Sequence, residues 1–148
     1  MPGTSLHQTD PPDAHALDAA LAAVGDRWTL LVVNALLGGP RRFGELQQEI
    51  PEIAPNILTR RLRALERDAL VVARPYSTRP PRMVYELSAT GAELAGALRL
   101  LAGWGARNVS GALAPRHALC GSPMEARWWC PTCRQPAAED PAEDLHFL

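Results

Sequence analysis

Residues 55–67 have the sequence PNILTRRLRALER, and the spacing of its leucines decides the fold. Leu58, Leu62 and Leu65 recur at intervals of four and three residues, the period of a helix that buries one face. Pro55 suits the first turn of such a helix, where its missing N–H is not needed. At about 100° per residue, the opposite face carries polar side chains. These are Asn56, Arg60, Arg63 and Arg67, with Thr59 on the flank.

Three more helices are predicted before this one. Apolar residues at helical spacing place them over about residues 13–24, 27–37 and 43–50. Asp13 is positioned to cap the first helix, and glycines and prolines mark the ends of all three. Because a turn of only a few residues separates the third helix from Pro55, the pair is predicted to form a helix-turn-helix.

A change of pattern after residue 69 predicts a β-hairpin. Residues 70–76 and 82–87 have the composition of strands, and the proline-rich loop 77–81 between them forms an exposed tip. Thr90 and Glu93 have capping-box spacing and are expected to begin a long helix that ends near Val109. The predicted fold class is therefore mainly α with a small β-hairpin (α+β): a winged helix-turn-helix with flanking dimerisation helices.

The chain is long enough for one compact domain with tails. It has 148 residues, 47% of them hydrophobic, which allows a buried core. We expect a flexible N-terminal tail over 1–12, a winged DNA-binding and dimerisation domain over 13–110, a Cys/His segment over 111–136 and an acidic tail over 137–148. The sequence has neither a membrane-spanning apolar stretch nor a signal-peptide pattern, so we expect no membrane contact and a cytoplasmic location.

The distribution of charge favours a nucleic-acid partner more than its sum does. The formal net charge is −1, and all fifteen basic residues are arginines. Residues 26–90 contain ten arginines against seven acids, whereas the last ten residues contain four acids and no basic residue. A mildly basic middle is thus masked by an acidic tail, and double-stranded DNA is the partner we expect.

The polar face of this helix, which is predicted to run from Pro55 to about Asp68, supplies the side chains that bases in a major groove require. Arginine can pair with guanine O6 and N7, and asparagine with adenine N6 and N7. The wing and the start of the third helix add arginines for backbone or minor-groove contacts. Solvated ion pairs and a plain surface turn are the alternatives. The candidate DNA-binding residues are Arg41, Arg42, Asn56, Thr59, Arg60, Arg63, Arg79 and Arg82.

Four motifs, in order, resemble the HxlR-type winged helix-turn-helix regulators. They are GDRWTLL at 25–31, GPRRFGEL at 39–46, LTRRLRALE at 58–66 and PPRMVYEL at 80–87, and the resemblance covers about residues 15–105. It implies a bacterial or archaeal transcription factor, a repressor by default, that is homodimeric through its first and last helices. Many relatives carry a cysteine near the start of the first helix, which some use to sense oxidants. His15 stands there in this chain, so the resemblance does not extend to that sensor.

The flanking helices give a second reason to expect a homodimer. Leu94, Leu98, Leu101 and Trp104 offer more apolar surface than a small core needs, although both flanking helices could instead cap their own core. A dimer would bind a roughly palindromic operator. No residue can be named for a small-molecule effector, which stays an open expectation.

The cysteines cluster near the C-terminus with metal-ligand spacing. His117 and Cys120 form one pair, and Cys130 and Cys133 form another. Two such turns supply the tetrahedral ligand set that zinc prefers, so we predict a structural zinc ion in a short zinc-ribbon-like tail. A redox-active thiol pair and no special role are the alternatives. No acid, base and nucleophile converge in the sequence, so we expect no enzyme; the alternative function is a protein-interaction adaptor with a zinc-stabilised tail.

Overall fold

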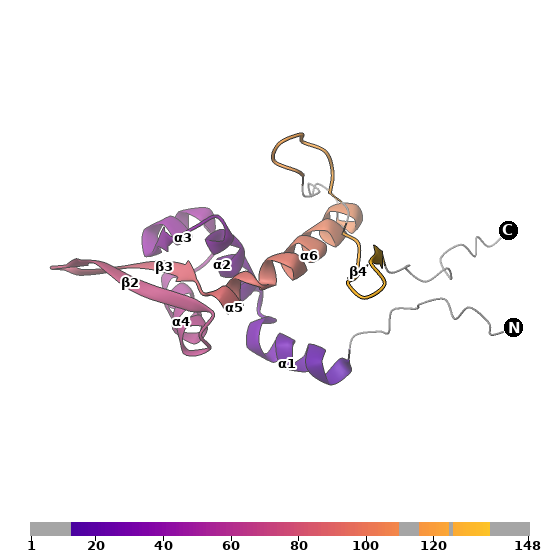
Figure 1. The fold of residues 1–148 in the computed structure, drawn as a ribbon. Helices are drawn as coiled ribbons and strands as arrows, with labels where there is room; N and C mark the ends of the chain where they lie inside the picture. The colour runs from indigo at the N-terminus through magenta and orange to yellow at the C-terminus, as the bar shows by residue number, and fades with distance from the viewer. Residues whose placement is uncertain (1–12, 110–115, 125, 137–148) are drawn as a thin grey trace, which may run out of the picture.

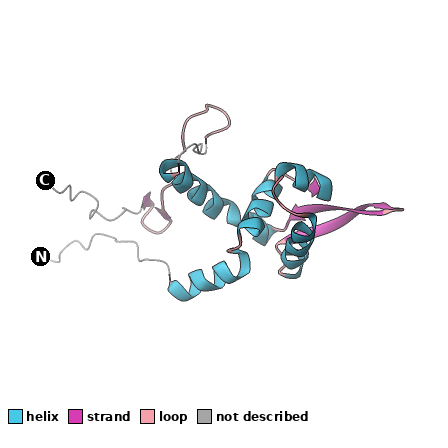
Figure 2. Cartoon of the chain, turned by 180° about the vertical axis from the view of Figure 1, so that it is seen from behind, coloured by secondary structure: helices cyan, strands magenta, loops and turns pink. Residues whose placement is uncertain are grey.

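The computed structural model describes residues 13–109, 116–124 and 126–136 (Figure 1). Helices make up most of these residues, and a long hairpin extends from them (Figure 2). The predicted helical architecture with a small hairpin is confirmed. The elements are α1 (Ala14–Val24), α2 (Arg27–Leu37), β1 (Arg41–Arg42), α3 (Phe43–Glu49), α4 (Pro55–Arg67), β2 (Val71–Thr78), β3 (Pro81–Leu87), α5 (Ala89–Ala92), α6 (Leu94–Asn108), β4 (Trp129–Cys130) and β5 (Gln135–Pro136).

Aspartates begin the first two helices. Asp13 Oδ1 accepts hydrogen bonds from the backbone N–H groups of His15 and Ala16, at 2.8 and 3.1 Å. Asp26 Oδ1 does the same for Trp28 and Thr29, at 3.0 and 3.1 Å. Each cap satisfies backbone donors that lack partners within the helix and contributes about 1 kcal/mol. The predicted bounds of α1 to α4 are accordingly confirmed to within one or two residues.

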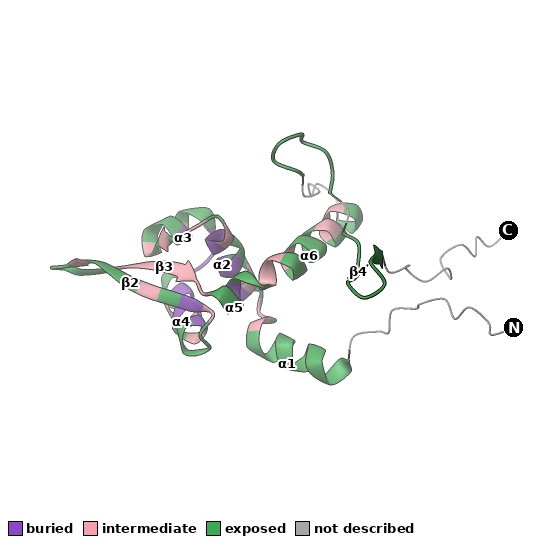
Figure 3. Ribbon diagram, in the orientation of Figure 1, coloured by how far each residue is buried: buried purple, intermediate pink, exposed green. Residues whose placement is uncertain are grey.

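The core lies between α2, α3, α4 and the base of the hairpin. Leu58, Leu62 and Leu65 of α4 are at most 1% exposed, which confirms that the leucines face inward. Figure 3 shows the buried residues gathered in α2 and α4, with the outer surfaces exposed. The other buried hydrophobic residues are Val32, Val33, Ala35, Leu36, Leu46, Ile50, Ile53 and Val71.

The wing is a three-stranded antiparallel sheet in the order β1-β3-β2. Its hairpin pairs Val71 with Leu87 at the base and Thr78 with Pro81 at the tip, so the connecting loop is shorter than the predicted 77–81. The third strand, β1, pairs Arg41 with Tyr85 and was not predicted. It fixes the segment before α3 to the wing.

The predicted start of the long C-terminal helix at Thr90 is wrong. Ser88 is the cap: its Oγ accepts from the Gly91 N–H at 3.0 Å and donates to the Ala69 carbonyl oxygen at 2.7 Å. Helix α5 therefore begins at Ala89, and α6 follows after Glu93. Gly91 is buried, and a Cβ there would collide with the carbonyl oxygen of Leu70. This close approach of Gly91 to Leu70 fixes the position of α5 against the end of the hairpin.

Helices α1 and α6 extend from the core on the side away from the wing tip (Figure 1). Neither helix contributes a buried residue, and both are mostly exposed in Figure 3. In the described part of the chain, no single helix is long and apolar enough to cross a membrane; only α1 and α2 taken together pass that test, and they are bent by 79°.

Candidate nucleic-acid interface

The outer face of α4 presents the predicted base-reading side chains to solvent. Asn56, Arg60 and Arg63 are exposed, and Thr59 is partly exposed. Asn56 Oδ1 accepts from the Ile57 N–H at 3.0 Å, which leaves its amide NH₂ to donate outward. The Thr59 hydroxyl donates to the Pro55 carbonyl oxygen at 2.9 Å. Within the described residues, the guanidinium groups of Arg60 and Arg63 form no hydrogen bond or ion pair.

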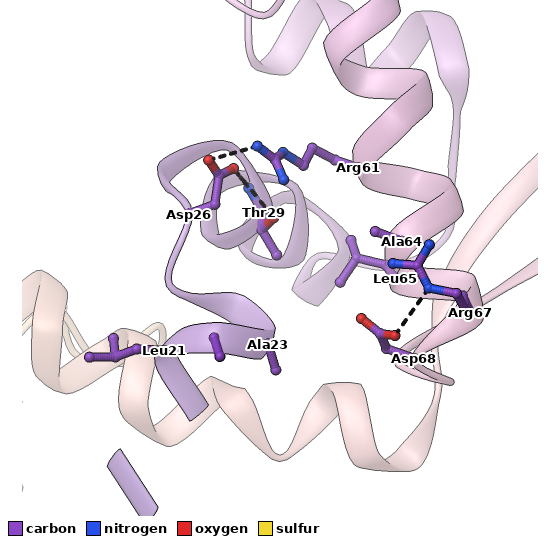
Figure 4. Close-up of a pocket in the computed structure, with 10 residues that line it drawn as sticks. Leu21, Ala23, Asp26, Thr29, Arg61, Ala64, Leu65, Arg67 and Asp68 are labelled. Carbon is purple, nitrogen blue, oxygen red and sulfur yellow. Dashed lines mark hydrogen bonds and ion pairs between the residues drawn. The ribbon is translucent and has the colours of Figure 1, made fainter. Parts of the chain in front are cut away.

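Arg61, which was not among the predicted site residues, fixes the orientation of α4. Its Nη2 donates to Asp26 Oδ2 at 2.9 Å, while the other oxygen of that carboxylate caps α2 (Figure 4). One aspartate thus positions two helices. The side chains of Arg60 and Arg61 point about 100° apart around the helix. Arg61 therefore holds the helix in place, while Arg60 is free to meet a ligand.

A cavity of about 200 Å³ lies beside this ion pair. Figure 4 shows its lining from the end of α1, the start of α2 and one side of α4. Arg61 is one of the residues that line the cavity, and its Nε is buried without a hydrogen-bond partner in the described part of the chain. The lining residues are Leu21, Ala22, Ala23, Asp26, Thr29, Arg61, Ala64, Leu65, Arg67 and Asp68.

The wing tip places two more arginines in solvent. Arg79 and Arg82 are exposed, and the guanidinium group of neither one forms a hydrogen bond or ion pair within residues 13–109, 116–124 and 126–136. Further down the hairpin, Arg74 Nε lies 2.6 Å from Glu86 Oε1, so its charge is compensated. The positive charge of the wing is therefore concentrated at its tip.

The structure separates the roles of Arg41 and Arg42. Arg41 Nε lies 3.1 Å from Glu49 Oε2, and Arg41 also donates to the Pro40 carbonyl oxygen at 3.2 Å. The exposed Arg42 instead places its guanidinium 4.4 Å from the centre of the Tyr76 ring of the wing. Such stacking orders the guanidinium but leaves its N–H groups available. Arg42 is thus the better placed of the two for a phosphate.

Tyr85 lies in the sheet close to α4. Burial raises the pKa of its hydroxyl, the Glu66 carboxylate raises it further, and the charge of Arg63 acts in the opposite direction. The hydroxyl therefore stays protonated at neutral pH.

The C-terminal segment brings the predicted metal ligands together as two pairs. His117 Nδ1 lies 3.4 Å from Cys120 Sγ, and the Cys133 N–H donates to Cys130 Sγ at 3.5 Å. A hydrogen bond from the Ser122 side chain lowers the pKa of Cys120, and the backbone N–H of Cys133 lowers the pKa of Cys130. No three potential ligands converge among the described residues, so zinc stays a prediction.

The predicted tails, 1–12 and 137–148, lie outside the described residues.

Comparisons with known proteins agree with this geometry. The family model of the HxlR-like helix-turn-helix matches residues 23–112. The HTH-type transcriptional regulator YtcD of Bacillus subtilis is 35% identical over 95 residues, which are 64% of this chain and 75% of YtcD. The HTH-type transcriptional regulator Rv3095 of Mycobacterium tuberculosis is 34% identical over 125 residues, 82% of this chain and 78% of the relative.

A solved structure extends the similarity to three dimensions. The crystal structure of the HTH-type regulator ytcD superimposes with a TM-score of 0.59 at 35% sequence identity. The superposition covers 63% of this chain and 95% of that one. The part of the chain that resembles known regulators thus includes α4 and the wing, whose exposed arginines are described above.

Proposed function

Because the chain belongs to the HxlR-like helix-turn-helix family of transcriptional regulators, we propose that it binds a specific DNA operator as a homodimer and represses transcription. The observation that carries the proposal is the exposure of Asn56, Arg60 and Arg63 on a helix whose other face is buried. The test is to select duplexes from random-sequence DNA with the purified protein and to measure their affinity by gel shift. The proposal assigns no enzymatic activity.

Helix α4 is the element proposed to enter the major groove. Its exposed face offers bidentate donors for guanine from Arg60 and Arg63 and an amide for adenine from Asn56. The Asp26–Arg61 ion pair holds the helix against α2, so the helix itself need not be reoriented at the moment of binding. Phosphate contacts from Arg42 would set the register of the protein on the duplex.

We expect the wing arginines to contribute affinity more than specificity. Replacing Arg79 and Arg82 together by alanine removes two phosphate or minor-groove contacts from each wing, and therefore four from the proposed dimer. The slope of log K against log salt should become shallower by about four, and affinity should fall at least roughly 10-fold at physiological salt. Fluorescence anisotropy over a series of salt concentrations measures both quantities.

Arg74→Ala is the matched control for the wing, because Arg74 lies on the same hairpin but is paired with Glu86. It should leave the salt slope nearly unchanged. An unchanged slope in the Arg79/Arg82 double variant would show that the wing tip does not touch DNA.

Exposed apolar helices support the homodimer. Helix α1 has 11 residues and none is buried, and an isolated helix of that length is marginal in water. Its Leu17 and Leu21 are 49% and 56% exposed, and Leu101 and Trp104 of α6 are 54% and 56% exposed. A second copy that packs against both helices would cover this surface and give a closed, two-fold assembly. Two recognition helices would then meet half-sites about one helical turn apart or a multiple of it.

The dimer can be tested on α6. Trp104→Glu places a charge on each side of a two-fold interface, so the molar mass measured by light scattering should fall from two chains to one at micromolar concentration. Arg99→Glu is the control, because Arg99 is exposed on α6 but about 140° around the helix from Trp104. A parent protein that is already monomeric, or a Trp104→Glu variant that stays dimeric, contradicts this interface.

The cavity of Figure 4 is the place we propose for a small-molecule effector. A ligand there would contact α1, a proposed dimer helix, and α4, the proposed reading helix, at once. It could accept a hydrogen bond from the unpaired Arg61 Nε. Such a ligand changes the affinity for DNA only if it binds the DNA-bound and the DNA-free conformation of the protein with different affinities. From the proposed DNA-binding role we also infer a cytoplasmic location.

A further inference from the structure

The segment that follows α6 contains two turns of the same construction, which we name knuckle 1 (residues 116–123) and knuckle 2 (residues 129–136). Knuckle 1 is closed by a bridge between Arg116 and Pro123, and knuckle 2 by the pairing of β4 with β5. Each carries two potential metal ligands three positions apart: His117 and Cys120 in the first, Cys130 and Cys133 in the second.

The backbone of the two knuckles is equivalent position by position. In knuckle 1, the Gly121 N–H donates to the His117 carbonyl oxygen at 2.8 Å. In knuckle 2, the Arg134 N–H donates to the Cys130 carbonyl oxygen at 2.8 Å. The residue after the second ligand has a positive φ in both cases, +69° at Gly121 and +55° at Arg134. Arginine rarely adopts this conformation, so the turn is held by more than local preference.

This shared turn directs both ligands of a pair to one point. The distance from His117 Nδ1 to Cys120 Sγ is 3.4 Å. Two ligands of one tetrahedral zinc ion, with zinc–nitrogen and zinc–sulfur bonds of about 2.1 and 2.3 Å, lie about 3.6 Å apart. In knuckle 2 the Cys133 N–H donates to Cys130 Sγ at 3.5 Å, so the turn holds the sulfur of the first cysteine beside the backbone of the second.

The knuckles also leave apolar surface uncovered. Leu119 of knuckle 1 is 90% exposed, Trp129 of knuckle 2 is 60% exposed, and Trp128 beside it is 62% exposed. Figure 1 shows the two knuckles apart, beyond the C-terminal end of α6. A segment this short has too few residues for a core of its own. A metal ion that joins the knuckles would bring these apolar side chains together, so that each knuckle covers part of the other.

We propose that His117, Cys120, Cys130 and Cys133 bind one zinc ion that joins the two knuckles into a small ribbon. The ion replaces the protons of up to three thiols, which pass to the solvent, and binds the neutral imidazole through Nδ1. Three thiolates and one Zn²⁺ leave a net charge of −1, which Arg116 and Arg134 on the two knuckles offset. With four protein ligands the site has no open position, so its role is structural.

The test is a titration of the reduced full-length chain with Co²⁺, followed by displacement with Zn²⁺. We expect one metal ion per chain, thiolate-to-cobalt charge-transfer bands, and an apparent zinc Kd below about a micromolar. Cys120→Ser, Cys133→Ser and His117→Asn should each weaken binding by more than about 100-fold. His15→Asn, which changes an exposed histidine on α1, is the matched control and should bind as the parent does.

Three results would overturn the proposal. The first is a parent spectrum without charge-transfer bands, as expected if Cys130 and Cys133 serve only as a redox pair. The second is a spectrum that survives both Cys120→Ser and His117→Asn, which would restrict binding to knuckle 2. The third is one metal ion for every two chains. Circular dichroism and operator binding of the ligand variants show whether the winged domain is intact, so loss of metal is distinguishable from loss of fold and from failure of the DNA-binding proposal.

Discussion

Replacement of both Arg60 and Arg63 by alanine is expected to weaken binding to the selected operator by at least about 100-fold, because each bidentate arginine–guanine pair contributes about 1–3 kcal/mol of discrimination. Both side chains are exposed and form no hydrogen bond or ion pair in the described part of the chain. The substitutions should therefore leave the free energy of unfolding nearly unchanged. Gel shift and urea unfolding measure the two effects separately.

Arg67→Ala is the matched control for this pair. Arg67 is on the same exposed face of α4, but it lies at the C-terminal end of the helix and its Nε is 3.6 Å from Asp68 Oδ1. In the proposed dimer the control removes one positive charge from each α4 and should weaken binding only a few-fold, as the loss of one phosphate contact per half-site does. A double variant that binds the operator as tightly as the parent would refute the recognition face and favour the protein-interaction alternative.

Leu62→Ala should destabilise the winged domain by about 2–5 kcal/mol. Leu62 is 1% exposed and lies in the centre of the leucine face of α4, where the loss of three carbon atoms leaves a cavity that close-packed neighbours fill poorly. The free energy of unfolding from urea titration, followed by far-UV circular dichroism, measures the loss. DNA affinity should fall with it, since α4 is both a core element and the proposed reading element.

The matched control is Leu119→Ala in the metal-free protein. It makes the same chemical change at a leucine that is 90% exposed, so the free energy of unfolding should change by less than about 0.5 kcal/mol. If Leu62→Ala proved as harmless as Leu119→Ala, α4 would not be packed against the core as described.

Local patterns were enough to predict α1 to α4 and the hairpin. The leucine spacing of α4, the Asp13 cap of α1 and Pro55 at the start of α4 are each patterns within a few residues of the chain. The exposure of Asn56, Arg60 and Arg63 followed from the same spacing, because a helix that buries three leucines must turn the intervening residues outward.

Contacts between distant residues could not be predicted. Strand β1 consists of Arg41 and Arg42 alone, which is too short for any alternation to be detected, and it exists because β3 pairs with it. The Arg61–Asp26 ion pair joins residues 35 positions apart, and nothing local distinguishes Arg61 from Arg60. The true cap at Ser88 depends on the Ala69 carbonyl oxygen and on the close approach of Gly91 to Leu70, both of which are tertiary.

The most direct test of the central proposal is to compare the operators selected by the parent with those selected by the single variants Arg60→Ala and Arg63→Ala. If α4 reads base edges in both half-sites of a palindrome, each variant should lose preference at one base position and at its symmetry mate, and keep the rest of the motif. A variant motif identical to that of the parent, with affinity lowered equally on all sequences, would mean that these arginines touch only phosphates, and the proposed recognition by α4 would be wrong.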